Sequence, residues 1–382
     1  MTPDAPSIVV QENHRSLCDG LTLTLIPLDV CMEAPIAQAD VFFLCTFLPQ
    51  ILYYIERYVT ASLFVDHCRD QLPVLGSFLD RIAVDHFDEI LEVLTAKSCS
   101  VDRNYDRLEW LGDGVLKLIH TDSLLYSDQL YKWASCLHEG DLSLLRSSLG
   151  SNEILFRMCE RIGFNKYILF RPFGRGLWAP TGLESYSIHS DGTLVLSELN
   201  QSRPGRKICA DVIESIIGLI YIKFDFDAAY NVASELGITL PRGAKTVSKV
   251  PNYKRKTDLE DAAFRVLGGF RFNNPELLEE ALTHPSCLHE QVPSYQQLEW
   301  VGDAALCLFA RNWIFHKFPN LTVGELVVME ASIVCNETLA YICILNKLQV
   351  YLNHVDTSLP KKIADYEHSV GPKGRGLWAT GE

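Results

Sequence analysis

Apolar residues recur at helical spacing over much of the chain. Between residues 41 and 170 they repeat every three or four positions, and this spacing predicts amphipathic helices. Residues 21–28, LTLTLIPL, alternate apolar and polar positions instead, which is typical of a strand. Residues 179–206 are rich in Ser, Gly, Pro and Thr and predict a long loop. We therefore expect helices interrupted by one long loop.

The longest apolar run extends from Val41 to Ile55, and Pro49 and Gln50 interrupt it. A run this short and broken does not predict a transmembrane helix, so we expect a buried connector helix. The first ten residues, MTPDAPSIVV, lack the charged segment and apolar core of a signal peptide. We therefore expect a cytoplasmic or nuclear protein with no membrane partner.

A nine-residue phrase occurs twice in the chain. Residues 108–116 read LEWLGDGVL, and residues 298–306 read LEWVGDAAL. Other blocks recur in the same order: Leu94-Thr95 with Leu282-Thr283, Gly140-Asp141-Leu142 with Gly324-Glu325-Leu326, Asn152-Glu153 with Asn336-Glu337, and GRGLWA at 174–179 with GRGLWA at 374–379. A repeat of this length is too long for a solenoid unit and indicates a domain duplication.

The repeat predicts the domain organisation. We expect an N-terminal tail and connector region at 1–84, a first domain at 85–240, a basic linker at 241–256, and an incomplete second domain at 257–382. The glycines of the two phrases, Gly112 and Gly302, would let the two phrase helices approach each other closely. Because duplicated domains tend to keep the interface of an ancestral dimer, we expect those helices to pack together.

Each copy of the phrase carries two carboxylates four residues apart. Glu109 and Asp113 form the first pair, and Glu299 and Asp303 form the second. Residues four apart lie on one face of a helix, where two like charges repel each other. A divalent cation between them would relieve that repulsion, since carboxylate oxygens are the ligands that hard cations prefer. A solvated helix face is the alternative interpretation.

A second acidic helix is predicted at 207–218, where the sequence reads KICADVIESIIG. Asp211 and Glu214 are three residues apart on one face, and Gly218 leaves room there for a neighbouring helix. The opposite stripe, Ile213, Ile216, Ile217 and Ile220, has the spacing of a buried face. Together with Glu109 and Asp113, these acids could hold one or two Mg²⁺ ions for hydrolysis of a phosphodiester.

These motifs resemble the ribonuclease III family. DRLEWLGD at 106–113 is similar to the family's signature helix, and KxxADxxE at 207–214 is similar to its second acidic helix. Tandem copies, with residues 26–58 ahead of them, resemble the catalytic end of Dicer-like proteins. The resemblance implies an all-α pair of domains, arranged as an intramolecular pseudo-dimer that cuts double-stranded RNA with Mg²⁺ or Mn²⁺. It assigns catalysis to Glu109, Asp113, Asp211 and Glu214, and implies that Lys207 reaches the scissile phosphate.

The sequence departs from the family pattern at several positions. Asp106 and Gln296 replace the first glutamate of the signature, and no D-x-x-E follows Asp303. The second site would therefore have only Glu299 and Asp303 as metal ligands, and we expect it to be inactive. Helicase, PAZ and double-stranded-RNA-binding modules are not in the sequence. Two alternatives remain. The chain is a catalytically impaired module that binds RNA or a protein, or it is a piece of a longer Dicer-like chain.

The overall charge argues against binding nucleic acid by bulk attraction. The formal net charge is −14 and the pI is near 5.3. Contacts with RNA would come from local basic residues, for which the candidates are Arg175, Lys249, Lys254, Arg255 and Lys256. A solvated interdomain linker explains the stretch at 242–256 equally well. We expect a monomer that contains its own domain pair.

Overall fold

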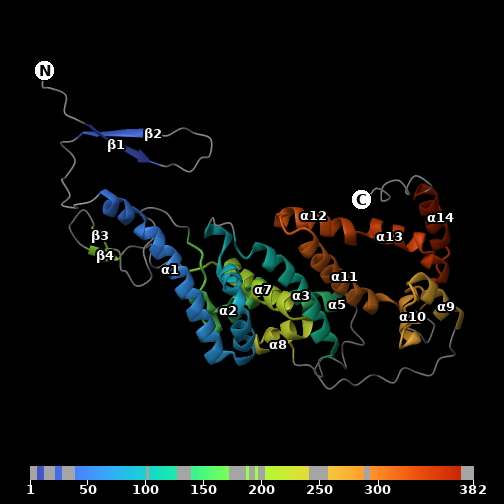
Figure 1. Cartoon of the computed structure of the whole chain (residues 1–382). Helices are drawn as coiled ribbons and strands as arrows, with labels where there is room; N and C mark the ends of the chain where they lie inside the picture. The colour runs from blue at the N-terminus through green and yellow to red at the C-terminus, as the bar shows by residue number, and fades with distance from the viewer. Residues whose placement is uncertain are drawn as a thin grey trace. The chain divides into compact units, whose positions relative to one another are not determined.

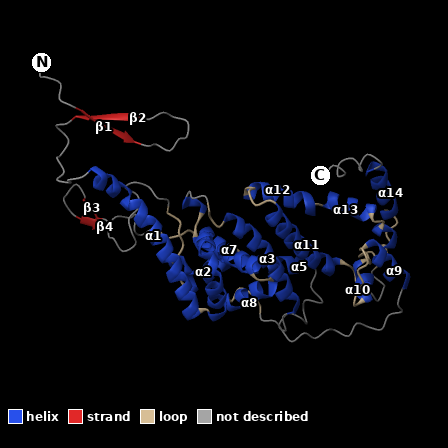
Figure 2. Cartoon of the chain, in the orientation of Figure 1, coloured by secondary structure: helices blue, strands red, loops and turns tan. Residues whose placement is uncertain are grey.

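The computed structural model describes residues 7–12, 22–27, 39–99, 103–126, 139–171, 186–188, 194–196, 203–240, 257–287 and 293–370. Helices dominate this part of the chain, as the blue ribbons of Figure 2 show. The chain divides into two compact units, Met1–Ile55 and Glu56–Glu382. Both copies of the repeated phrase lie in the second unit, and the expected all-α architecture of the duplicated domains is confirmed.

The first unit contains a β-hairpin and the start of a long helix. Strand β1 (Ser7–Glu12) pairs antiparallel with β2 (Thr22–Pro27), which confirms the strand expected at 21–28. Helix α1 (Ala39–Gln71) continues through Pro49 into the second unit. The expectation of a buried connector helix is wrong for its first described side chains, because Phe47 and Leu48 are 44% and 49% exposed. Complete burial begins in the later turns of α1, where Ala61 and Phe64 join the hydrophobic core.

The first domain surrounds one central helix, labelled α7 in Figure 1. Its helices are α2 (Pro73–Leu94), α3 (Asp106–Tyr126), α5 (Glu139–Leu149), α6 (Asn152–Ile162), α7 (Arg206–Lys223) and α8 (Phe226–Leu236). Helix α2 begins at Pro73, ahead of the boundary expected at residue 85. Helix α7 contacts α2, α3, α6 and α8. Its isoleucine stripe is at most 1% exposed, as the spacing predicted. Because α7 has neighbours around most of its circumference, its acidic face is buried as well.

Part of the segment predicted as a long loop is a small hairpin. Strand β3 (Tyr186–Ile188) pairs antiparallel with β4 (Leu194–Leu196). The sequences YSI and LVL contain the aromatic and branched residues that favour strands, but the Ser- and Gly-rich flanks hide so short a signal. The prediction of an irregular loop at 179–206 is therefore wrong for these two strands.

Two glycines bring α3 and α7 into backbone contact. A Cβ atom added at Gly112 would lie 1.9 Å from the carbonyl oxygen of Glu214, and one at Gly218 would lie 2.3 Å from that of Leu108. The room predicted at Gly218 is confirmed. The role predicted for Gly112 is wrong, because this glycine faces α7 and not the second phrase helix. Around Gly302, the described residues place no heavy atom within 4 Å of an added Cβ.

The second domain repeats the local structure of the first. Its helices are α9 (Thr257–Val266), α10 (Pro275–Ala281), α11 (Gln296–Lys317), α12 (Val323–Val334), α13 (Asn336–Leu345) and α14 (Leu359–Val370). Thr95 forms a parallel bridge with Leu169, and its repeat partner Thr283 forms one with Asn353. Matched backbone contacts of this kind confirm the duplication in the fold.

The two phrase helices, α3 and α11, pack against each other as predicted. Arg107 of α3 donates hydrogen bonds to the carbonyl oxygens of Phe315 and Phe318, at 3.1 Å each. From α11 of the second domain, the indole nitrogen of Trp300 donates a hydrogen bond to Ser143 of α5 in the first domain at 3.1 Å. The glycine at this interface is Gly114, where an added Cβ would lie 2.7 Å from Cδ of Arg311. Gly112 and Gly114 point in nearly opposite directions on α3, because successive helical residues turn by 100°.

Among the described residues, no single helix is long and apolar enough to cross a membrane. The pair α12 and α13, bent by 40° at the break between them, satisfies the same test of length and composition.

Candidate metal centre

Three of the predicted carboxylates meet where α3 crosses α7. Glu109 lies in the first turn of α3, and Asp211 and Glu214 lie on the face of α7 that meets it. One oxygen from each of the three lies within 4.8 Å of the others. Asp211 and Glu214 are only 6% and 7% exposed. Since hard divalent cations bind oxygens at about 2.0–2.6 Å, one ion between the three could reach all of them.

Burial gives these carboxylates unusual proton affinities. Burial, reinforced by the charge of Asp211, raises the pKa of Glu109 to about 7. Burial also raises the pKa of Glu214 to about 9, and the charge of Asp113 adds to the shift. The cluster therefore favours a positive charge among its acids, supplied by protons or by a metal ion.

Lys207 and Tyr105 hold Asp211 in place from two sides. The ammonium of Lys207, one turn before Asp211 on α7, donates to Oδ1 at 2.9 Å and lies 3.8 Å from Oε1 of Glu109. The hydroxyl of Tyr105 donates to Oδ2 of Asp211 at 3.1 Å. Sequence reasoning did not select Tyr105, although the repeat contains a signal for it, because Tyr295 precedes the second phrase at the same place.

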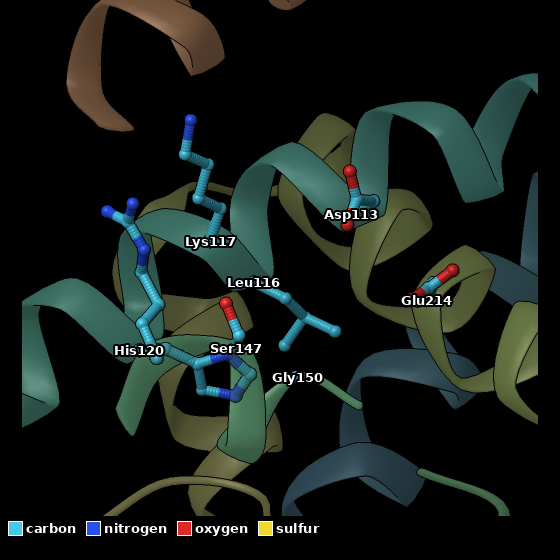
Figure 3. A pocket seen from close by; sticks show the side chains of 8 residues that line it. Asp113, Leu116, Lys117, His120, Ser147, Gly150 and Glu214 are labelled. Carbon is cyan, nitrogen blue, oxygen red and sulfur yellow. The ribbon is translucent and has the colours of Figure 1, made fainter. Parts of the chain in front are cut away.

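Asp113 lies beside the cluster but is not one of the three acids that converge. Its carboxylate is half-exposed and accepts a hydrogen bond from Arg311 of α11 at 2.7 Å. Figure 3 shows Asp113 on α3 and Glu214 on α7, at one side of a cavity of about 230 Å³. The other side chains that line the cavity include Lys117, His120 and Arg146, so acidic and basic groups share one opening.

The second pair of carboxylates is arranged differently. Asp303 accepts a hydrogen bond from Lys117 of the first domain at 2.8 Å. Burial raises the pKa of Glu299, with further contributions from Glu139 and Asp303. Within the part of the chain that the structure describes, the three-acid cluster of the first domain is the only such group, and neither Glu299 nor Asp303 belongs to one.

The predicted RNA-binding residues lie outside the described residues. These are Arg175, Lys249, Lys254, Arg255 and Lys256, together with the rest of the linker at 241–256. The repeated GRGLWA blocks at 174–179 and 374–379 also lie outside them.

Comparison with known proteins identifies the family. The model of the ribonuclease III domain matches residues 106–225 and 296–377, which together make up more than half of the chain. The chain therefore belongs to the ribonuclease III family, and the two matches coincide with the two copies of the repeat.

Individual relatives narrow the resemblance to Dicer proteins. Protein Dicer of Schizosaccharomyces pombe is 28% identical over 340 residues, which cover 85% of this chain and 23% of that protein. Endoribonuclease Dicer homolog 1 of Arabidopsis thaliana is 28% identical over 318 residues, which cover 74% of this chain and 16% of that protein. The nuclease domain of ribonuclease III from Campylobacter jejuni matches 43% of this chain at 25% identity, with a TM-score of 0.30. The chain is thus Dicer-like and spans less than a quarter of the length of these Dicer relatives.

Proposed function

We propose that this chain is a metal-dependent endoribonuclease that hydrolyses phosphodiester bonds of double-stranded RNA, in a Dicer-like role in RNA silencing. The supporting observation is the cluster of Glu109, Asp211 and Glu214 inside a ribonuclease III domain. Mg²⁺ is the ion we expect there, with Mn²⁺ as a substitute, because both accept carboxylate oxygens.

The residues around the cluster fit a divalent ion and a phosphate. A divalent ion held there would polarise the phosphate and lower the pKa of a bound water. Tyr105 fixes Asp211 by its hydrogen bond to Oδ2, so one oxygen of that carboxylate is oriented in advance. Lys207 has a side chain 70% exposed, and its ammonium is therefore within reach of both the acids and a phosphate oxygen. We assign to Lys207 the binding of the scissile phosphate.

We also propose how the duplex is bound. Phosphate contacts dominate the affinity of proteins for nucleic acids, and the net charge of −14 requires that they be local. We assign these contacts to Arg175, Lys249, Lys254, Arg255 and Lys256. The domain pair forms within one chain, so we propose that a monomer acts, in the cytoplasm or the nucleus.

A second candidate function is a catalytically impaired module that binds RNA or a protein. The surroundings of Asp303 favour it, because Asp303 is paired with Lys117 and belongs to no group of three acids that could hold a metal ion among the described residues. This candidate still binds RNA or a protein, but it predicts no cleavage that depends on the carboxylates of α7.

Substitution of Asp211 distinguishes the two candidates. In the full chain with Mg²⁺ at low salt, we expect Asp211→Asn to slow cleavage of a long RNA duplex by about 100-fold or more. Loss of a residue that only hydrogen-bonds to a metal ligand typically lowers activity about 10–100-fold, and loss of a ligand itself should cost at least as much. The control is Asp66→Asn, which removes an exposed acid paired with Arg69 on α1. Cleavage that is absent in the parent, or unchanged in Asp211→Asn, would support the impaired module instead.

A further inference from the structure

One arginine of the second domain reaches into the first site. Arg311 lies on α11, and only 13% of its side chain is exposed. Its Nη1 donates to the carbonyl oxygen of Trp110 and to Oδ2 of Asp113, and its Nε donates to Glu330 at 2.8 Å. The guanidinium carbon also lies 5.3 Å from the centre of the Trp110 ring, which favours a cation.

The first domain is shaped to receive this side chain. The Cδ atom of Arg311 would lie 2.7 Å from a Cβ at Gly114, so a larger residue there would displace the arginine. The other contacts, an α3 carbonyl, an indole face and a carboxylate, all come from the turn that contains Trp110 and Asp113. Arg311 is therefore a fixed part of the first site and not a surface side chain that happens to lie near it.

Arg311 accounts for the position of Asp113. Glu109 and Asp113 lie one turn apart on α3, and both were expected among the ligands. Glu109 meets the two acids of α7, whereas Asp113 does not belong to the group within 4.8 Å. A guanidinium and a carboxylate form a strong charge-assisted hydrogen bond, and this one is directed towards α11.

The repeat shows that this contact is specific to the first site. Alignment of the two phrases places Thr121 at the position equivalent to Arg311, and alignment of α5 with α12 places Arg146 at that of Glu330. Arg146 stacks over the ring of Trp300, 4.7 Å from its centre, and donates to Thr121, so each signature tryptophan is covered by an arginine. The aspartate of the second phrase, Asp303, is instead held by Lys117.

We propose that Arg311 is a positioning residue of the first metal centre, which keeps Asp113 out of the carboxylate cluster and competes with a divalent ion for it. The second domain thereby sets the metal affinity of the first. The inference rests on the proposed function, since it requires a divalent ion at the cluster. It predicts that removal of the guanidinium adds a fourth ligand and tightens metal binding.

The test measures Mn²⁺ binding by the full chain, from the electron paramagnetic resonance signal of free Mn²⁺. We expect Arg311→Met to tighten binding roughly fivefold or more, the coupling typical of contacting residues. Asp113→Asn in the Arg311→Met background should return the affinity to within about twofold of the parent. The Mn²⁺ affinity of Arg311→Lys should lie between those of the parent and of Arg311→Met, because lysine keeps the charge but not the planar fork of the guanidinium.

A matched control separates this effect from loss of domain docking. Arg107→Met removes hydrogen bonds from the same interface without touching a carboxylate of the cluster, and its Mn²⁺ affinity should stay within about twofold of the parent. Because Arg311→Met leaves the buried Glu330 without its partner, the double variant Arg311→Met/Glu330→Gln is made alongside it.

Two variants with Arg311 intact give a further check. Asp113→Asn alone should weaken Mn²⁺ binding less than threefold, whereas Asp211→Asn should weaken it more than tenfold, on the order of a lost ligand contact.

Three results would overturn the role of Arg311. They are unchanged or weaker Mn²⁺ binding in Arg311→Met, a gain that persists without Asp113, and an Asp113→Asn defect as large as that of Asp211→Asn. A parent chain that binds no Mn²⁺, by contrast, would refute the metal centre of the proposed function and the arginine's role with it.

Discussion

Glu214 is the clearest case of a side chain whose behaviour depends on its packing. The sequence shows its spacing from Asp211, and this spacing placed both acids on one helix face. That this face is itself buried could not be predicted from the spacing. Burial is the largest cause of its raised pKa, followed by the charge of Asp113. An unfolded glutamate has a pKa near 4.5, so Glu214 at about 9 and Glu109 at about 7 hold protons in the folded state that they lose on unfolding.

This difference predicts a pH dependence of the metal-free protein. Glu214 between pH 4.5 and pH 9, and Glu109 between pH 4.5 and pH 7, bind more protons in the native than in the unfolded state, so their contribution to the free energy of unfolding falls as the pH rises. Burial lowers the pKa of His120 to about 4, and this group has the opposite effect only below about pH 6.5. We expect the Tm in EDTA to be lower at pH 8.5 than at pH 5.5 by at least about 3 °C. Glu214→Gln should flatten this dependence, whereas Glu153→Gln, at a half-exposed carboxylate of α6, should not. A Tm that rises over this range would contradict the buried acidic cluster.

At the scale of elements, the crossing of α3 and α7 positions the site. Its two glycines replace side chains with backbone contact, and this brings Glu109 to within reach of Asp211 and Glu214. The sequence indicated a close neighbour at Gly218 but could not identify it. Gly112 and Gly302 occupy the same place in the repeated phrase, yet among the described residues only Gly112 has a helix packed on it.

The contrast between the glycines gives a stability prediction. Gly218→Ala places a Cβ 2.3 Å from the Leu108 carbonyl, and we expect overpacking to destabilise the protein by about 1–3 kcal/mol. The matched variant, Gly302→Ala, meets no described atom within 4 Å and should gain up to about 1 kcal/mol from helix propensity. Midpoints of urea denaturation measure both effects. Equal shifts in the two variants would mean that α3 and α7 do not cross as described.

At the scale of the whole molecule, the sequence predicted much of the arrangement because the chain contains its own repeat. The helical domains, the contact between α3 and α11 and the place of Glu109 could be derived from the repeated motifs. Asp211 and Glu214 lie in a motif that occurs once, and they were derived from its helical spacing and its resemblance to the ribonuclease III family. The partners of Asp113 and Asp303 could not, because Arg311 and Lys117 have no equivalents of their own type at the matched positions, Thr121 and Cys307. The two copies differ at such positions, and a comparison based on their shared residues cannot predict the contacts that the differing residues make.

That asymmetry leads to a prediction for the duplex. The first site has three converging acids with Lys207, while the second has Glu299 and Asp303, the latter paired with Lys117. Loss of carboxylates weakens a hard-cation site severely, so one chain should nick only one strand of a bound duplex. The assay labels each strand separately and follows cleavage with Mg²⁺ at low salt, over a range of protein concentrations. Equal cleavage of both strands, at a ratio independent of protein concentration, would show that the second site is active within the monomer. Equal cleavage that appears only at high concentration would show instead that a second copy supplies the other first-domain site.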